Sequence, residues 1–302
     1  MPTSEEPDSR LDARRVALVL DWFEASARDL PWRRPGCSAW GVLVSEVMLQ
    51  QTPVARVLPV WEVWMARWPT PERLAADTQA DAVRAWGRLG YPRRAKRLWE
   101  CARVVVDRHG GLVPSDADAL LALPGVGDYT ASAVRAFAFG ERAVVLDTNV
   151  RRVLARVWSG EPLPPTSVRA AERQLAERVA PVDPARAAAW AVASMELGAL
   201  VCTARSPRCD ECPVMSSCAW FAGGRLGLED APRKTQAWHG TDRQVRGRIL
   251  ALLRDAEGPM VVEGRAVLAD VEPGQVDSCL ESLLADGMVA LVDADRGLVE
   301  LA

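Results

Sequence analysis

Four cysteines fall within seventeen residues of the chain: Cys202, Cys209, Cys212 and Cys218. Four thiolates on one short segment suit either a tetrahedral zinc ion or a [4Fe–4S] cluster. Zinc ligands usually come as two well-separated Cys-x-x-Cys or Cys/His pairs, whereas only one such pair occurs here and the other spacings are six and five residues. The clustering predicts a metal centre rather than a disulfide framework, and the spacing favours the cluster over zinc.

A glycine turn and an acid downstream of it form a second group with chemical potential. The turn, LPGVG at 123–127, lies between two apolar helical stretches. Its glycines let the backbone approach a ligand, and the N–H groups that open the next helix suit a phosphate. Asp147 follows the apolar run at 143–146 and is typical of the N-cap of a helix that runs to Trp158. This segment can therefore hold an anion at one end and present a carboxylate at the other.

A second acid, Glu46, lies in the largely apolar stretch VSEVMLQQT at 44–52. Burying a carboxylate there is expensive unless it faces a cleft or a partner. In a cleft of low polarity its pKa would rise, so that it could carry a proton at neutral pH. Considered by itself, Glu46 could equally be a solvated residue on a helix.

The elements that must position these residues are helices. Up to about residue 220 apolar residues recur at helical spacing, and no stretch has a convincing strand pattern. The sequence therefore predicts an all-α region. Its helices are expected at 13–27, 39–51, 53–68, 81–88, 94–109, 115–123, 129–139, 147–158, 167–179 and 184–200, with a short one starting at Pro71.

Composition divides the chain further. The polar residues 1–10 are expected to be disordered, 11–221 to form the helical core, and 222–240, rich in Gly, Pro and charge, to form a linker. Two helices followed by a hairpin predict a small α+β, winged-helix-like module at 241–302. Its elements are expected at 243–256, 273–285, 288–292 and 297–301.

Charge and hydropathy exclude some classes of protein. The formal net charge of −3 argues against a generally basic nucleic-acid binder, although it does not describe local patches. Neither a signal peptide nor a membrane span is predicted, so we expect a soluble cytoplasmic protein. Almost all the basic residues are arginines, and the two lysines are Lys96 and Lys234.

The cysteine spacing after an LGA-x-x-C helix end, together with LPGVG and Asp147, resembles the helix-hairpin-helix DNA glycosylases that carry a [4Fe–4S] loop. The resemblance covers about residues 13–221. It implies a two-lobed helical fold, with the substrate base flipped into the cleft between the lobes. It also implies a [4Fe–4S] cluster on the four cysteines, Asp147 as the catalytic carboxylate, and a phosphate-binding hairpin that contains Gly125, Val126 and Gly127.

Within that family, SEVMLQQT resembles the MutY-type adenine glycosylases. The resemblance implies that Glu46 protonates adenine while Asp147 stabilises the oxocarbenium-like sugar or attacks it, as paired carboxylates do in glycoside hydrolysis. Endonuclease III-type lyases place a lysine where this chain has Tyr129, so no amine is there to form a Schiff base. Other positions carried over are Asn149 as support for the acid, Trp32, Arg33, Leu49 and Val54 as the adenine pocket, and Gln51 and Tyr91 as residues that insert into the duplex.

We therefore expect a monomeric, nucleoid-associated, monofunctional adenine DNA glycosylase that acts on double-stranded DNA with A:8-oxoguanine or A:G mispairs. Three departures from the family pattern are Pro92 in place of a second aromatic, Val192 in place of a polar residue, and the absence of a recognisable Nudix-like C-terminal domain. One alternative is a thymine or uracil mismatch glycosylase or an endonuclease III-type enzyme. The other is a non-catalytic DNA-binding module, which the winged-helix-like tail would favour.

Overall fold

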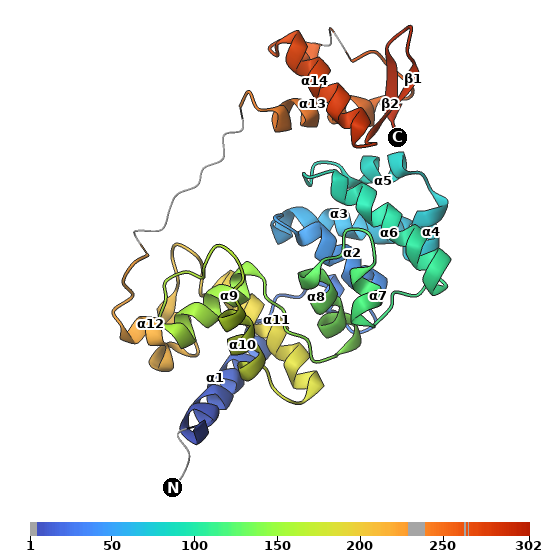
Figure 1. Ribbon diagram of the computed structural model, residues 1–302. Helices are drawn as coiled ribbons and strands as arrows, with labels where there is room; N and C mark the ends of the chain where they lie inside the picture. Colours follow the sequence, from blue (N-terminus) through green and yellow to red (C-terminus); the bar gives the residue numbers. More distant parts are fainter. Residues whose placement is uncertain (1–4, 229–238, 263, 265) are drawn as a thin grey trace. The chain divides into compact units, whose positions relative to one another are not determined.

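The computed structural model describes residues 5–228, 239–262, 264 and 266–302. Within them the chain is helical apart from one β-hairpin near the C-terminus (Figure 1). Its contacts form two compact units, neither of which is one continuous stretch. The first unit comprises Met1–Leu43, Ser115–Ala122 and Val126–Arg233, and the second comprises Val44–Pro114, Leu123–Gly125 and Lys234–Ala302.

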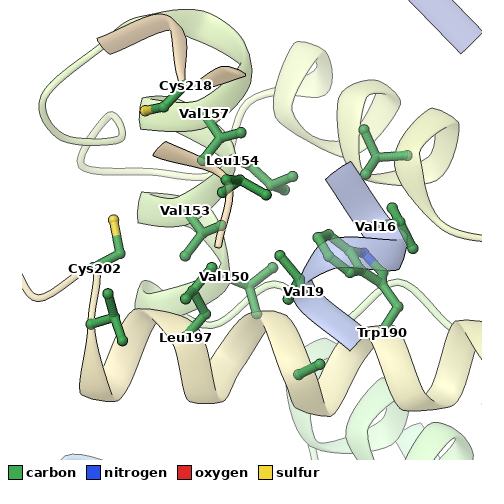
Figure 2. Close-up of a cluster of buried hydrophobic side chains, with 14 of the residues drawn as sticks. Val16, Val19, Val150, Val153, Leu154, Val157, Trp190, Leu197, Cys202 and Cys218 are labelled. Atoms are coloured by element: carbon green, nitrogen blue, oxygen red, sulfur yellow. The ribbon is translucent and has the colours of Figure 1, made fainter. Parts of the chain in front are cut away.

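The core of the first unit lies between α1 (Glu5–Ser26), α9 (Thr148–Leu154) and α11 (Pro184–Leu200). Figure 2 shows valine and leucine side chains from α1 and α9 meeting a tryptophan and a leucine of α11. They are Val16, Val19, Val150, Val153, Leu154, Trp190 and Leu197. The other elements of this unit are η1 (Pro31–Arg33), α7 (Ala117–Leu121), α8 (Asp128–Phe139), α10 (Ala170–Val179), η3 (Cys209–Glu211), η4 (Met215–Ser217) and α12 (Ala219–Ala222).

One helix departs from the predicted regularity. The sequence predicts a single α-helix over 147–158, whereas α9 gives way at Ala155 to a π-helical turn, η2 (Ala155–Ser159). The wider turn contains Arg156, whose side chain is fully buried. The buried guanidinium is satisfied by backbone carbonyls, including those of Pro162 at 2.8 Å and Thr203 at 2.7 Å. Such π turns are rare and often lie at functional sites.

The second unit receives the end of α2 (Ala39–Leu49) and contains α3 to α6. Its core is built on tryptophans, with Trp64 packed edge-on against Trp68 and Trp86 at centroid distances of 4.6 and 5.7 Å. All three rings are buried, and edge-to-face packing adds to the stabilisation from their burial. The helices are α3 (Val54–Arg67), α4 (Pro71–Ala76), α5 (Gln79–Trp86) and α6 (Arg93–His109).

Residues 241–302 form a small module within the second unit. Two helices, α13 and α14, pack against each other and are followed by an antiparallel hairpin in which Val289 pairs with Leu301. Met260 adds one bridge to Val299 at the side of the hairpin. The two helices and the hairpin confirm the predicted elements. They are α13 (Asp242–Asp255), η5 (Ala266–Leu268), α14 (Pro273–Ala285), β1 (Val289–Asp293) and β2 (Leu298–Leu301).

Helix α1 begins at Glu5, so the predicted disorder of 1–10 is wrong for residues 5–10, while 1–4 lie outside the described residues. Hydrophobic periodicity does not mark the polar start as helical, because the apolar residues that face the core, such as Val16 and Val19, come later in α1. Most of the predicted linker, 229–238, also lies outside the described residues. No helix in the described part of the chain is long and apolar enough to cross a membrane.

Candidate active site and iron–sulfur loop

Asp147 is held rigidly at the start of α9. It is the N-cap that the sequence predicts, with Oδ1 accepting from the Val150 N–H at 2.6 Å and Oδ2 accepting from Asn149 Nδ2 at 2.6 Å. Burial raises the pKa of Asp147, and the N–H donors of Val150 and Asn149 and the charge of Arg152 offset only part of that rise. A carboxylate fixed in this way can stabilise a positive charge that develops beside it.

A short chain of side chains joins Asp147 to the cysteine loop. Asn149 Oδ1 accepts from Arg152 Nη2 at 2.8 Å, and Arg152 Nε donates to the Cys202 carbonyl at 2.7 Å. The same guanidinium donates to the Gly198 carbonyl at 2.6 Å, which ties α9 to the end of α11. The orientation of the acid therefore depends directly on how the first cysteine of the loop is placed.

The four cysteines line a single pocket together with Arg156 and Trp220. Arg156 Nη1 lies 3.4 Å from Cys202 Sγ, and its guanidinium stacks on Trp220 at 4.5 Å. Burial, together with the other cysteines, raises the pKa of Cys212 to about 12, and burial also raises the pKa of Cys218, so these two thiols need a cationic centre to ionise.

No three His, Cys, Asp or Glu side chains in the described part of the chain are grouped around one metal ion. Four thiols around one pocket instead fit a [4Fe–4S] cluster, whose irons each bond one thiolate at separate corners. The donor set and the pocket thus suit the cluster that the spacing favours.

A second buried acid, Glu196 on α11, binds two arginines. It accepts from Arg28 Nε at 2.7 Å and Nη2 at 2.6 Å, and from Arg33 Nη2 at 2.9 Å. Burial acts to raise the pKa of Glu196, but the hydrogen bonds and charges of the two arginines prevail and hold it at about 2. Arg33 keeps Nη1 buried with no hydrogen-bond partner in the described chain, and the neighbouring Trp32 is buried as well. This pair is the portion of the predicted adenine pocket that lies in the first unit.

Sequence reasoning missed Glu196 and its neighbour Gly198. A Cβ on Gly198 would lie 2.7 Å from Asn149 Cβ and 2.8 Å from its carbonyl oxygen, so only glycine lets α11 approach α9 this closely. The signal was available, because a glycine inside a helix lowers stability and usually has a packing reason. A glutamate beside that glycine in an otherwise apolar helix was the second clue.

Glu46, Leu49, Val54, Gln51 and Tyr91 belong to the second unit. Glu46 is buried, with 4% of its surface exposed. Leu49 and Val54 are half-buried, Gln51 is exposed, and Gln51 and Tyr91 both have left-handed backbone with φ of 56° and 49°. Non-glycine residues adopt that backbone rarely, and it clusters at functional sites.

Arg94 organises the backbone around Gln51 and Tyr91, and sequence reasoning missed it. Its Nη1 donates to the carbonyls of Val47 at 2.9 Å and Gln50 at 2.5 Å, so it closes the C-terminal end of α2. Its guanidinium also lies 5.3 Å from the centroid of the Tyr91 ring. Burial lowers the pKa of Arg94 to about 10, although the nearby Tyr91 acts to raise it. No local pattern marks it out, because it is one of many arginines in α6.

The glycine turn has the backbone that its sequence predicts. Gly125 has φ of 80°, and a Cβ there would lie 2.9 Å from Arg97 Cβ. Gly127 is the N-cap of α8 and makes no side-chain cap hydrogen bond, and Val126 between the two glycines is buried. Tyr129, in the first turn of α8, packs against a small alanine-rich cluster of the first unit.

Comparison with known proteins identifies the family. Residues 44–181 match the model of the HhH-GPD superfamily base excision DNA repair proteins, and residues 202–218, from the first to the last of the four cysteines, match the iron–sulfur binding domain of endonuclease III. The chain is 52% identical over 273 residues to the adenine DNA glycosylase of Mycobacterium tuberculosis, covering 90% of this chain and 88% of that protein.

Two further relatives agree with this assignment. The adenine DNA glycosylase of Mycolicibacterium smegmatis is 50% identical over 271 residues, covering 90% of this chain and 91% of that protein. A solved structure of a thermostable thymine-DNA glycosylase superposes with a TM-score of 0.65 at 28% identity, covering 72% of this chain and all of that one. The fold, the DNA substrate and the [4Fe–4S] cysteines predicted from sequence are thereby confirmed. The chain belongs to the adenine DNA glycosylases, the base excision repair enzymes of the HhH-GPD superfamily that carry an endonuclease III-type iron–sulfur domain.

Proposed function

We propose that this enzyme hydrolyses the N-glycosidic bond of adenine mispaired with 8-oxoguanine or guanine and leaves the DNA strand intact. The observation that carries the proposal is the fixing of Asp147 by Val150 and Asn149, which presents an immobile carboxylate without a direct ion pair to an arginine or lysine in the described chain. Such a group stabilises an oxocarbenium-like sugar or attacks its anomeric carbon.

The second carboxylate acts on the base. Glu46, buried on the apolar α2, donates a proton to N7 of the flipped adenine as the glycosidic bond breaks and its electron pair moves to the base. Water then forms the new bond to the anomeric carbon and gives its proton to the Glu46 carboxylate, which restores the acid. Tyr129 and Asn149 assist Asp147. Trp32 and Arg33, whose buried Nη1 is available to a base, line the adenine pocket with Leu49 and Val54.

We expect no strand cleavage, because a lyase needs an amine next to the sugar. Tyr129 stands where a lyase has its lysine, and Lys96 donates to the carbonyls of Asp286 and Gly287 in the C-terminal module, at 2.7 and 3.2 Å. Lys234 lies outside the described residues. Among the described residues neither Tyr129 nor Lys96 supplies an amine to the sugar, so we expect no Schiff base and no β-elimination.

DNA binding and domain organisation complete the proposal. The hairpin at Gly125, Val126 and Gly127 binds a backbone phosphate, while Gln51 and Tyr91 insert beside the flipped base. Cys202, Cys209, Cys212 and Cys218 would hold the [4Fe–4S] cluster, which would order the 202–218 loop and would take no part in cleaving the glycosidic bond. The enzyme acts as a cytoplasmic, nucleoid-associated monomer with a core at 11–221, a linker at 222–240 and a small C-terminal module at 241–302.

The decisive experiment compares Glu46→Gln with the unaltered enzyme on A:8-oxoguanine, A:G, T:G and thymine-glycol duplexes. We expect the variant to bind the A:8-oxoguanine duplex and to excise nothing, while the unaltered enzyme excises adenine and yields a nick only after hot alkali. Turnover by the variant would refute the role of Glu46. Preferred excision from T:G duplexes would instead support the thymine glycosylase alternative. No excision from any duplex would leave a non-catalytic DNA-binding module.

A further inference from the structure

The C-terminal module is acidic. Residues 241–302 contain six arginines and no lysine against twelve aspartates and glutamates, so their formal charge is 6 − 12 = −6. A surface of that balance repels DNA phosphates. A winged-helix arrangement usually suggests DNA binding, but the charge of this module points away from direct phosphate contact.

The module's arginines have partners of two kinds. Arg246 and Arg248 pair within the module, with Asp286 and with Asp270 respectively. Arg243 and Arg254 turn toward the helices of the second unit instead, where Arg254 Nη1 donates to the Gly87 carbonyl at 2.6 Å. Further contacts join α14 and its end to α5 and α6: Gln79 Nε2 donates to the Gly287 carbonyl at 2.7 Å, and Arg93 pairs with Asp286.

Two of these contacts fall on one loop, residues 87–92 between α5 and α6, which we call the Tyr91 loop. Its backbone is left-handed at Gly87, Gly90 and Tyr91, with φ of 56°, 85° and 49°. A tyrosine holds such a backbone only where its surroundings enforce it. The Tyr91 ring lies near two guanidinium groups, Arg243 of the module at 4.3 Å from its centroid and Arg94 at 5.3 Å.

The exposure of Tyr91 shows what the loop presents. The side chain keeps 38% of its surface exposed although two cations lie against it. An aromatic ring that is held in orientation and still partly open is a platform on which a base can stack. The guanidinium contacts restrict the ring without covering it. The ring therefore loses less conformational freedom when it binds DNA, and the entropic cost of binding is smaller.

We infer that the C-terminal module is an intramolecular clamp on the Tyr91 loop, and that Arg243 is a positioning residue that holds the Tyr91 ring ready to stack in the duplex. This inference rests on the proposed function for the stacking step alone. The module thus serves DNA recognition through the loop rather than through contacts of its own with phosphates.

The first test measures the clamp without any reaction. Hydrogen–deuterium exchange of the peptide that spans 87–94 is compared in full-length Arg243→Ala, Arg254→Ala and Arg248→Ala proteins. Arg248→Ala is the matched control, because its pair with Asp270 lies within the module. We expect exchange in this peptide to be several-fold faster in the first two variants and unchanged in the control. Equal exchange in all three would overturn the clamp.

The second test asks whether Arg243 acts through Tyr91. Affinity and excision on an A:8-oxoguanine duplex are measured for Arg243→Ala, Tyr91→Ala and the double variant, with Arg243→Lys as the conservative rescue. Arg243→Ala should weaken duplex binding roughly 2- to 5-fold, the factor that matches a cation–π contact of about 0.5–1 kcal/mol, with kcat unchanged. Arg243→Lys should restore most of the affinity, and Arg243→Ala should add nothing to Tyr91→Ala.

Two results would overturn the inference. If the losses of the single variants multiply in the double variant, Arg243 acts independently of Tyr91. If Arg243→Ala lowers the salt dependence of binding by about one phosphate contact, Arg243 contacts the DNA directly. Should the unaltered enzyme excise no base from any duplex, the proposed function fails, while the exchange measurement still decides whether the clamp exists.

Discussion

Asp147 and Glu196, two carboxylates of the first unit, differ in their hydrogen-bond donors and in burial, since Glu196 is fully buried and Asp147 is half-buried. Asp147 receives hydrogen bonds from a backbone N–H and from the neutral amide of Asn149, and burial raises its pKa. Glu196 receives its hydrogen bonds from two guanidinium groups, and its pKa falls to about 2. Both acids lie near the close contact of Asn149 on α9 with Gly198 on α11. Asp147 is hydrogen-bonded to Asn149, and Glu196 lies two residues before Gly198.

The difference separates an acid that reacts from an acid that supports. Full neutralisation by arginine would hold Asp147 in a stable ion pair and reduce what it could contribute to a developing positive charge. Neutral donors fix its position and leave its charge available. Glu196 instead pairs with Arg28 and Arg33 and holds both guanidinium groups in fixed positions. The kind of donor, more than the depth of burial, distinguishes the two roles.

The largest expected effect is on catalysis and comes from a substitution of Asp147, the acid that reacts. Asp147→Asn should lower single-turnover adenine excision by about 10³-fold, the loss typical of removing one group that stabilises a transition-state charge. That factor corresponds to about 4 kcal/mol. The fold should survive, because asparagine is as good an N-cap as aspartate. Excision within tenfold of the unaltered enzyme would show that Asp147 is a cap only.

The same variant has a signature in the pH dependence of stability. Because the folded pKa of Asp147 is raised, its contribution favours folding below its unfolded pKa and is lost as the pH rises through the folded value. Asp147→Asn should remove that loss, so urea unfolding at neutral pH should show the variant to be no less stable than the unaltered protein. A variant that unfolds more easily at neutral pH would contradict the raised pKa.

The contact between α9 and α11 carries the next largest effect. Gly198→Ala should lower the free energy of unfolding by about 1–3 kcal/mol, because the new methyl group overlaps Asn149 and its backbone. Excision should fall as well, since Asn149 holds Asp147. Gly247→Ala is a matched control in α13, where a Cβ meets no atom within 4 Å, and it should raise stability by about 0.5–1 kcal/mol. Equal stability in the two variants would mean that α9 and α11 are packed less tightly than described.

Removing the charge of Glu196, the acid that supports the two arginines, should cost less stability, and the loss should depend on pH. Glu196→Gln should lower the free energy of unfolding at neutral pH by about 2 kcal/mol, because hydrogen bonds to charged groups weaken. With a folded pKa of about 2, the stabilisation from Glu196 is complete above the unfolded value of about 4.3 and is lost as the pH falls toward 2. The difference between variant and unaltered protein should shrink over that range. Asp29→Asn, which breaks an exposed pair with Arg34, is the control and should leave the profile unchanged. If the variant and the unaltered protein still differ in unfolding free energy near pH 2, the effect does not come from the charge of Glu196.

Sequence alone predicts what depends on neighbours along the chain. The N-cap at Asp147, the glycine turn and most helix positions follow from residues within a few places of each other, and the cysteine spacing identifies the cluster. Glu196 could not be assigned its role in this way, because Arg28 is 168 residues away. Arg94 was missed for the same reason, since it binds carbonyls 44 to 47 residues earlier. The π turn at 155–159 was missed because a period of 3.6 residues describes only the regular helix.

The near absence of lysine has a practical consequence for labelling. Lys96, one of two lysines in the chain, has its ammonium group in contact with the Asp286 and Gly287 carbonyls of the C-terminal module. An acylating reagent can reach Nζ of Lys96 only when these two hydrogen bonds open. The rate at which Lys96 is acylated, read by mass spectrometry against the rate in urea-unfolded protein, therefore measures whether the C-terminal module of a preparation is seated.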